Sequence, residues 1–245
     1  MLTDLSTNDV HLTQAAQTVL ETRALTRTYS MGRDTVTALD SITICIERGE
    51  FVSIVGPSGS GKSTLLNLLG GLDTPTRGEV LLNGKTLAGL SEPESAKLRQ
   101  HTLGFIFQGY DLFPALTALE NVTYPLLIAG MSAPERSERA TELLHKVGLA
   151  NKLHHFPDEL SGGQQQRVGI ARALAAHPLV LLADEPTGNL DSTTAEDILN
   201  LLTALVTDDG LTLIMVTHDA EAARRANRVL TLKDGRLQAS QAQGV

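Results

Sequence analysis

Apolar residues along this chain of 245 residues fall into short runs that alternate with segments of helical spacing. Such alternation predicts an α/β fold, in which helices cover a mostly parallel sheet. Three runs contain hardly any polar residue, and strands of that kind belong at the centre of a sheet. They are FVSIV at 51–55, LVLLAD at 179–184 and TLIMVTH at 212–218. Further strand-like segments are EVLLNG at 79–84, LGFIFQG at 103–109 and RVLTLKDG at 228–235.

The first part of the chain has a different pattern. Polar and apolar residues alternate with period two over residues 18–55, and MGRD at 31–34 has the composition of a hairpin turn. We therefore expect an antiparallel sheet beside the parallel one. Ser91 and Glu94 form an S-x-x-E capping pattern, which predicts a further helix before the strand LGFIFQG.

The middle of the chain is expected to be helical. No long apolar strand occurs between Gln108 and Leu160, and PERSERATELLHKVGL at 134–149 is amphipathic at helical spacing. We predict a helical subdomain at about residues 109–160, inserted into the sheet. One α/β domain should cover residues 18–237, between a polar leader at 1–17 and a frayed tail at 238–245.

Composition narrows the possible partners and surroundings. The chain has 28 acidic and 20 basic side chains, a formal charge of −8, so we expect no broad attraction for nucleic acid or anionic lipid. Cys45 is the single cysteine, which excludes disulfides within the chain. We predict that it is a small buried core residue, compatible with a reducing cytosol.

Residues 1–17 lack the features of a secretory signal, and no apolar run approaches the ~18 residues of a membrane span. Any role at a membrane is therefore expected to act through a partner.

The stretch GPSGSGKST at 56–64 follows a predicted strand and precedes a predicted helix. It matches the pattern G-x-x-x-x-G-K-[ST], whose backbone N–H groups form a nest for phosphate oxygens at a helix N-terminus. An ordinary glycine turn is the alternative, but chance produces the pattern about 0.01 times in such a chain. We therefore predict a nucleoside triphosphate site, with Lys62 at the β- and γ-phosphates and the Ser63 hydroxyl on Mg²⁺. The predicted contacts are Gly56, Ser58, Gly59, Ser60, Gly61, Lys62, Ser63 and Thr64.

A pair of carboxylates ends the apolar strand LVLLAD. In this position Asp184 is predicted to hold Mg²⁺, and Glu185 is predicted to polarise the water that attacks the phosphate. Two adjacent acidic residues can also form a solvated turn. A histidine pair earlier in the chain, His154 and His155, has no evident third ligand, so we expect a solvated loop there rather than a metal site.

The segment LSGGQQQR at 160–167 completes a set of motifs. Together with the phosphate nest, Gln108, the acidic pair and His218 it resembles the ATP-binding cassette (ABC) ATPases, over essentially residues 18–237. The resemblance implies a P-loop NTPase core with an antiparallel β subdomain and an inserted helical subdomain. It also implies ATP hydrolysis with Mg²⁺ as cofactor.

The resemblance assigns roles to further residues. Tyr29 matches the aromatic that stacks on adenine, Gln108 the glutamine that reaches the metal and the water, and His218 the histidine at the γ-phosphate. Asp191 matches a loop that crosses to a second subunit. Each residue also has a structural alternative: Tyr29 can pack on the sheet, Gln108 can belong to a loop, His218 can be a core residue, and Asp191 can cap a helix.

The family geometry further implies a homodimer. The signature segment of one chain faces the phosphate nest of another, so that each site is completed in trans. The residues involved are Ser161, Gly162, Gly163 and Gln164. Ser161 can equally be a plain helix cap followed by a glycine turn. An isolated monomer is expected to be a poor ATPase.

Two segments resemble one branch of the family in particular. They are EPTGNLDS at 185–192 and QGYDLFPALTALENVTYPLLIAG at 108–130, and the branch includes lipoprotein-releasing, macrolide-efflux and cell-division ATPases. This likeness implies a separate membrane permease that binds at residues 109–128, and export, extraction or mechanical work at the cytoplasmic face of the inner or plasma membrane. Residues 109–128 can also form a core face of the helical subdomain. An importer subunit is an alternative; a soluble ATPase acting on nucleic acid is disfavoured by the acidic charge.

Overall fold

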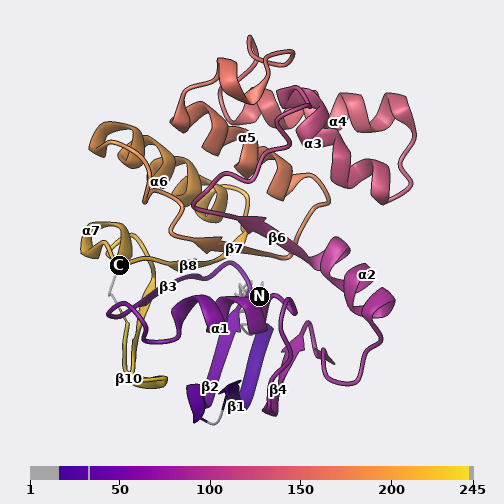
Figure 1. The fold of residues 1–245 in the computed structure, drawn as a ribbon. Helices are drawn as coiled ribbons and strands as arrows, with labels where there is room; N and C mark the ends of the chain where they lie inside the picture. Colours follow the sequence, from indigo (N-terminus) through magenta and orange to yellow (C-terminus); the bar gives the residue numbers. More distant parts are fainter. Residues whose placement is uncertain (1–16, 33, 243–245) are drawn as a thin grey trace, which may run out of the picture.

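The computed structural model describes residues 17–32 and 34–242, which form two sheets and a set of helices (Figure 1). Residues 1–16, most of the predicted leader, lie outside the described residues. In the described ranges, no helix is both long enough and apolar enough to span a bilayer.

The larger sheet has six strands in the order β10-β9-β3-β8-β7-β6. Its members are β3 (Phe51–Val55), β6 (Leu103–Ile106), β7 (Val180–Asp184), β8 (Thr212–Val216), β9 (Arg228–Lys233) and β10 (Arg236–Ala242). All neighbours are parallel except β9 and β10. The three most apolar runs lie inside the sheet, as predicted. The prediction of a frayed tail at 238–245 is wrong for residues 238–242. These residues belong to β10, in which Ser240 pairs with Leu230 of β9.

The smaller sheet is antiparallel, with the order β2-β1-β4-β5. Its strands are β1 (Thr18–Met31), β2 (Asp34–Glu47), β4 (Arg77–Leu82) and β5 (Lys85–Thr86). The predicted hairpin is confirmed, since Met31 pairs with Asp34 across the turn. The early antiparallel stretch ends at Glu47 rather than at residue 55, because β3 pairs in parallel with β8 and β9. The strands β4 and β5, later in the chain, complete the antiparallel sheet.

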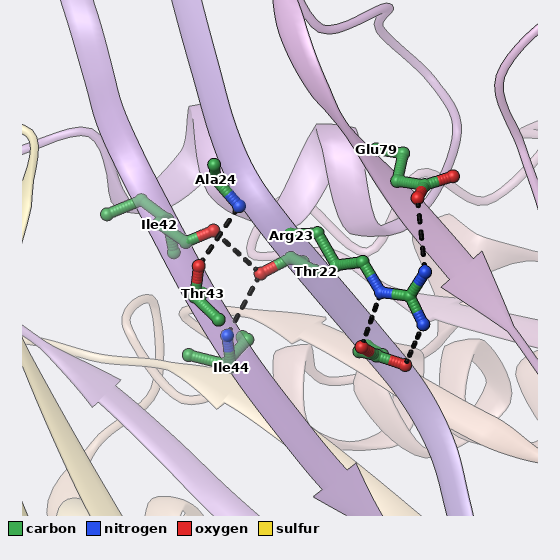
Figure 2. A network of polar contacts seen from close by, with 8 residues as sticks. Thr22, Arg23, Ala24, Ile42, Thr43, Ile44 and Glu79 are labelled. Carbon is green, nitrogen blue, oxygen red and sulfur yellow. Dashed lines mark hydrogen bonds and ion pairs between the residues drawn. The ribbon is translucent and has the colours of Figure 1, made fainter.

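A bulge in β1 is stabilised by threonine side chains (Figure 2). The pairing of β1 with β2 shifts register between Thr22 and Leu25, and Ala24 there has a φ of 44°. The buried Thr22 hydroxyl donates to the carbonyl of Ile42 at 3.0 Å and accepts from the N–H of Ile44 at 3.1 Å. The Ala24 N–H donates to the hydroxyl of Thr43 at 3.0 Å. At the bulge, threonine hydroxyls thus bond to backbone groups that the interrupted hydrogen-bond ladder between β1 and β2 leaves without a partner.

The helices flank the larger sheet on both faces (Figure 1). They are α1 (Lys62–Leu69), α2 (Glu92–Thr102), α3 (Ala118–Ile128), α4 (Ala133–Lys146), the short η1 (Pro157–Glu159), α5 (Gly162–Leu174), α6 (Ser192–Thr207) and α7 (Ala220–Ala223). Helix α1 lies between the two sheets, whereas α5 and α6 cover the opposite face. The predicted start of α2 is confirmed by a capping box, in which the Ser91 N–H donates to Glu94 at 2.9 Å.

Alternate side chains of the central strands enter two separate cores. Val52 and Ile54 of β3 pack with α1 and the antiparallel sheet, whereas Phe51 packs on the side of α5 and α6. This alternation follows from the period of two in a strand. It also explains why the prediction of a buried Cys45 is wrong: Ile44 and Ile46 of β2 point into the core, so Cys45 between them is exposed.

Candidate functional site

The carboxyl ends of the parallel strands meet at one edge of the larger sheet, where ligands bind in open α/β folds. A cleft of about 570 Å³ opens there. The loop after β3, the start of α1 and the ends of β6 and β7 line one side of it, and β2 and the β9–β10 turn line the other. Its lining residues are Val36, Thr37, Ala38, Ser58, Gly59, Gly61, Lys62, Ser63, Thr64, Gln108, Asp184, Glu185, Asp234 and Gly235.

The N-terminus of α1 faces this cleft without a cap. Gly61 occupies the N-cap position with a φ of 101°, makes no side-chain hydrogen bond to the helix, and is followed by no acidic residue in the first turn. Every other α-helix in the described ranges begins with a Ser, Thr or Asp at its N-cap. The first N–H groups of a helix have no intrahelical partner and carry partial positive charge. The start of α1 is therefore suited to an anion such as phosphate.

Two glycines let the loop before α1 pass against neighbouring backbone. A Cβ on Gly56 would lie 2.1 Å from the carbonyl oxygen of Leu232 in β9, and a Cβ on Gly61 would lie 2.5 Å from that of Ala38 in β2. The β9–β10 turn closes the same contact, because the Gly235 N–H donates to the Ser60 carbonyl at 3.2 Å. Side chains at these two positions would push the phosphate loop off both strands.

Lys62 supplies a positive charge at the mouth of the loop. Its ammonium group donates to the carbonyls of Gly56 at 2.9 Å and Pro57 at 3.0 Å. Ser58 and Gly59 lie at the exposed rim of the cleft, whereas the structure does not bring the Ser60 side chain to it. Ser60 is buried and its N–H donates to the Pro57 carbonyl, so it stabilises the conformation of the phosphate loop.

Asp184 is the metal-binding candidate of the cleft. Its carboxylate oxygen Oδ1 is buried and has no hydrogen-bond partner among the described residues. Burial raises the pKa of Asp184 and the charge of Glu185 adds to this effect, while Ser63 and Lys62 oppose it. An unpaired carboxylate oxygen beside a serine hydroxyl is the hard oxygen donor set that Mg²⁺ prefers. The residues present therefore fit a magnesium ion, and Gln108 on the same cleft wall could add an amide oxygen.

Glu185 and His218 form a pair at the ends of β7 and β8. The Glu185 carboxylate, whose side chain is 17% exposed, accepts from His218 Nδ1 at 2.7 Å, and the His218 side chain is 70% exposed. Because a carboxylate accepts only, Nδ1 carries a proton in this contact. Glu185 has a φ of 48°, an unfavourable conformation that its N–H bond to the Val216 carbonyl at 3.0 Å helps to hold. Strained residues of this kind often belong to functional sites.

Gln108 lies in the turn after β6 and lines the same cleft as the acidic pair. Its side-chain amide donates to Asn189 Oδ1 at 3.3 Å, and Asn189 Nδ2 donates back to the Gln108 carbonyl at 2.9 Å. The loops after β6 and β7 are thus joined by a reciprocal pair of bonds. Sequence reasoning gave Asn189 no role although it lies in the segment EPTGNLDS, because its partner Gln108 is distant in the sequence. It also missed the cleft wall made by residues 36–38 and 234–235, which has no local motif.

Tyr29 is not part of the cleft lining. Its hydroxyl donates to Asp73 at 2.7 Å, and the Arg27 guanidinium lies 4.5 Å from the centre of its ring. One ring face is therefore already covered by a cation. The adenine-stacking role of Tyr29 stays a prediction; the cleft residue Val36 pairs with it on the neighbouring strand.

The signature segment and Asp191 also lie outside the cleft lining. Ser161 is the N-cap of α5: its hydroxyl accepts from the N–H of Gln164 at 3.3 Å, and the Gln164 side chain accepts from the N–H of Ser161 at 3.0 Å. Asp191 is the N-cap of α6 and accepts from the Thr194 N–H at 3.0 Å. A Cβ on Gly163 would lie 2.2 Å from the Thr194 methyl carbon, so the two helix starts are packed together. Within one chain, Ser161 and Asp191 therefore act as helix caps, the alternative role that the sequence left open. A capping residue can still contact a second chain.

The histidine pair lies in a loop, as predicted. The Lys152 ammonium is 3.2 Å from His155 Nε2, and His154 is exposed. Across residues 17–32 and 34–242, no group of three or more His, Cys, Asp or Glu side chains is placed to hold a metal ion.

The comparisons with known proteins agree with this geometry. The family model described as "ABC transporter" matches residues 39–188. The chain belongs to the ABC transporter family. It is 51% identical to the lipoprotein-releasing system ATP-binding protein LolD of Pseudomonas fluorescens, over 89% of this chain and 96% of that protein. It is 50% identical to the macrolide export ATP-binding/permease protein MacB of Hyphomonas neptunium, over 89% of this chain but 34% of that longer protein.

Solved structures give the same result. The chain is similar, with a TM-score of 0.85 and 47% identity, to the dimeric post-hydrolysis state of the ATP-binding cassette MJ0796 bound to ADP and Pi. That likeness covers 92% of this chain and 100% of the other. MJ0796 is a protein of Methanocaldococcus jannaschii. The predicted ABC ATPase fold and ATP hydrolysis are thereby confirmed, and this chain is an ATP-binding ABC ATPase.

The burial of Asp184 generates a prediction. Asp184→Asn removes a charge whose burial is unfavourable, so we expect the unfolding midpoint without nucleotide to rise by about 2 °C at pH 8. The difference should shrink as the pH falls toward the raised pKa, because protonation then removes the same charge from the wild type. Hydrolysis with Mg²⁺ should fall at least about 100-fold. Asp158→Asn, at an exposed position, is the control and should change neither the unfolding midpoint nor the rate of hydrolysis. An Asp184→Asn variant that is less stable than the wild type and still hydrolyses ATP would contradict the metal-binding role of Asp184.

Proposed function

We propose that this chain is the ATP-hydrolysing subunit of an exporting or extracting transporter, that it works as a homodimer with Mg²⁺, and that it docks on a membrane permease. The observation that carries the proposal is the different placement of two helix N-termini, those of α1 and α5. The uncapped start of α1 faces the chain's own cleft, whereas the glycine-rich start of α5 does not line it.

The start of α5 supports the dimer. Ser161 is exposed, and a helix N-terminus followed by two glycines offers a second set of backbone donors to an anion. Because this set lies away from the chain's own nucleotide cleft, it is available to the cleft of another copy. MJ0796, which this chain resembles over nearly its whole length, is described as a dimer. Two copies related by a twofold axis would have two equivalent sites.

The residues of the cleft can divide the chemistry among them. The α1 N-terminus and the Lys62 ammonium would bind the phosphates and stabilise charge on the transferring group. Glu185 would accept the proton of the attacking water, while His218 orients its carboxylate. Ser63, Asp184 and Gln108 would hold Mg²⁺, which when bound would neutralise phosphate charge. Removal of one such stabilising group typically costs about 10²–10³ in rate.

An apolar groove supports the permease contact. Two adjoining cavities of about 610 and 350 Å³ lie between α2, the edge strand β6 and α3. Phe113 and Tyr124 line the smaller cavity, are exposed and have ring centres 4.7 Å apart, and Ile128 is 62% exposed. The predicted surface 109–128 is therefore part groove and part core, since Val122 and Leu126 are fully buried. The groove also includes residues that the sequence did not point to, among them Gln100, Leu103 and Phe105.

An amphipathic helix of a permease is the occupant that this groove fits. MacB is named as an ATP-binding/permease protein, so one relative of this chain combines an ATP-binding part with a permease. LolD is named as the ATP-binding protein of a lipoprotein-releasing system. By analogy the chain would act at the cytoplasmic face of the inner or plasma membrane.

Glu185→Gln tests the dimer and the catalytic role together. The substitution removes the base but leaves the phosphate contacts of α1 and Lys62, so ATP binding should persist while hydrolysis falls at least about 100-fold. With MgATP the variant should elute as a stable dimer on size-exclusion chromatography, and without nucleotide as a monomer. A monomer with near-normal turnover would refute the proposal.

Phe113→Asp tests the permease contact. A charge placed in the apolar groove should abolish co-purification with the candidate permease from the neighbouring gene, co-expressed and extracted in detergent. ATP binding by the isolated chain should be unchanged within about twofold, because Phe113 is far along the chain from the phosphate loop and does not line the cleft. Leu72→Asp, at another exposed apolar position, is the matched control and should keep the complex. Equal recovery of the permease with both variants would exclude this groove as the docking site.

A further inference from the structure

Gln166 occupies an unusual position on the signature helix. It lies five residues after Ser161 in α5, and its side chain is completely buried. Its amide nitrogen donates to the carbonyl of Pro186 at 2.6 Å and to that of Phe107 at 3.4 Å. Since carbonyls only accept, the orientation of this amide is determined by its two acceptors.

Both acceptors are the immediate neighbours of water-handling residues. Pro186 follows Glu185, and Phe107 precedes Gln108. One side chain of α5 therefore holds the loops after β6 and β7 from a position between them. The reciprocal bonds of Gln108 and Asn189 join the same two loops on the cleft side.

The same helix holds the segment after Gln108 as well. The Arg172 guanidinium donates to the carbonyls of Asp111 at 2.5 Å and Tyr110 at 3.0 Å. Tyr110 and Asp111 have φ values of 63° and 49°, in the left-handed region that non-glycine residues rarely adopt. A Cβ on Gly162 would lie 2.7 Å from the Tyr110 hydroxyl, so this loop also contacts the first turn of α5. The loop is thus held in a strained conformation by one helix along most of its length.

We propose that Gln166 is a positioning residue that couples the two ATP sites of the dimer. This proposal rests on the homodimer proposed above. In that dimer, α5 presents Ser161 to the nucleotide of the partner and, through Gln166, holds Gln108 and Glu185 of its own cleft. Five residues of helix span about 7.5 Å, so a shift of the α5 start on a partner's nucleotide is carried to both loops. Nucleotide held in one site would then set the geometry for attack in the other.

The chemistry of the contact requires an amide donor. Gln166 has two N–H groups for the two carbonyls, of which that of Pro186 is buried, and an apolar side chain of the same length would leave both carbonyls without this donor. Gln166→Met keeps length and burial and removes the donors. Gln165→Met is the matched control, since Gln165 is adjacent, half-buried, and donates to the Leu160 carbonyl at 3.1 Å rather than to either loop.

The test separates turnover from nucleotide binding. Steady-state hydrolysis should show a kcat at least about tenfold lower in Gln166→Met than in Gln165→Met, with nucleotide Kd by calorimetry unchanged within about twofold. In the Glu185→Gln background, Gln166→Met should still form the dimer with MgATP. Gln166→Asn, whose amide is one methylene too short to reach the carbonyls, should show the same loss and serves if the methionine variant is unstable.

Several results would overturn the inference. These are equal kcat in Gln166→Met and Gln165→Met, a kcat loss matched by an equal loss of nucleotide affinity, or failure of both Gln166 variants to fold. The last would make Gln166 a residue of the core alone. A wild-type protein that neither hydrolyses ATP nor dimerises would instead contradict the proposed function, so the two failures are distinguishable.

Discussion

The close approach of the phosphate loop to β2 and β9 is the constraint on which the site depends. With no Cβ at Gly56 and Gly61, the loop lies against the carbonyls of Leu232 and Ala38, and α1 begins with its first N–H groups directed at the cleft. This placement fixes where the phosphates can bind. The ends of β7 and β8 then bring Asp184, Glu185 and His218 to the same edge of the sheet, because parallel strands end together.

Much of this arrangement was predictable because the decisive signals are local. The apolar central strands, the phosphate loop, the acidic pair and the helix caps each occupy a few consecutive residues, whose backbone conformation follows from their own composition. The exposed Cys45 shows the limit of such reasoning: its neighbours Ile44 and Ile46 decide which face of β2 is buried. The pairing of Ser240 with Leu230 extends the β9–β10 hairpin past a register shift between Leu237 and Ser240, which local composition does not indicate.

Contacts made across the chain could not be predicted in the same way. Asn189 meets Gln108 from 81 residues away, and Gln166 meets Phe107 from 59 residues away. Nothing in the sequence near either residue indicates its partner, and a buried glutamine is ambiguous until its acceptors are known. These long-range bonds turn a set of separate motifs into one site, since they determine how the loops after β6 and β7 lie relative to α5.

Binding of the nucleotide phosphates at the start of α1 is the central claim, and equilibrium binding to Lys62→Ala tests it most directly. Isothermal calorimetry of the wild type with ATP should give one site per chain, and Lys62→Ala should weaken binding at least about 100-fold, because the loop loses its side-chain cation. Lys85→Ala, at an exposed position on β5, should bind like the wild type. Unchanged affinity in folded Lys62→Ala would contradict the account.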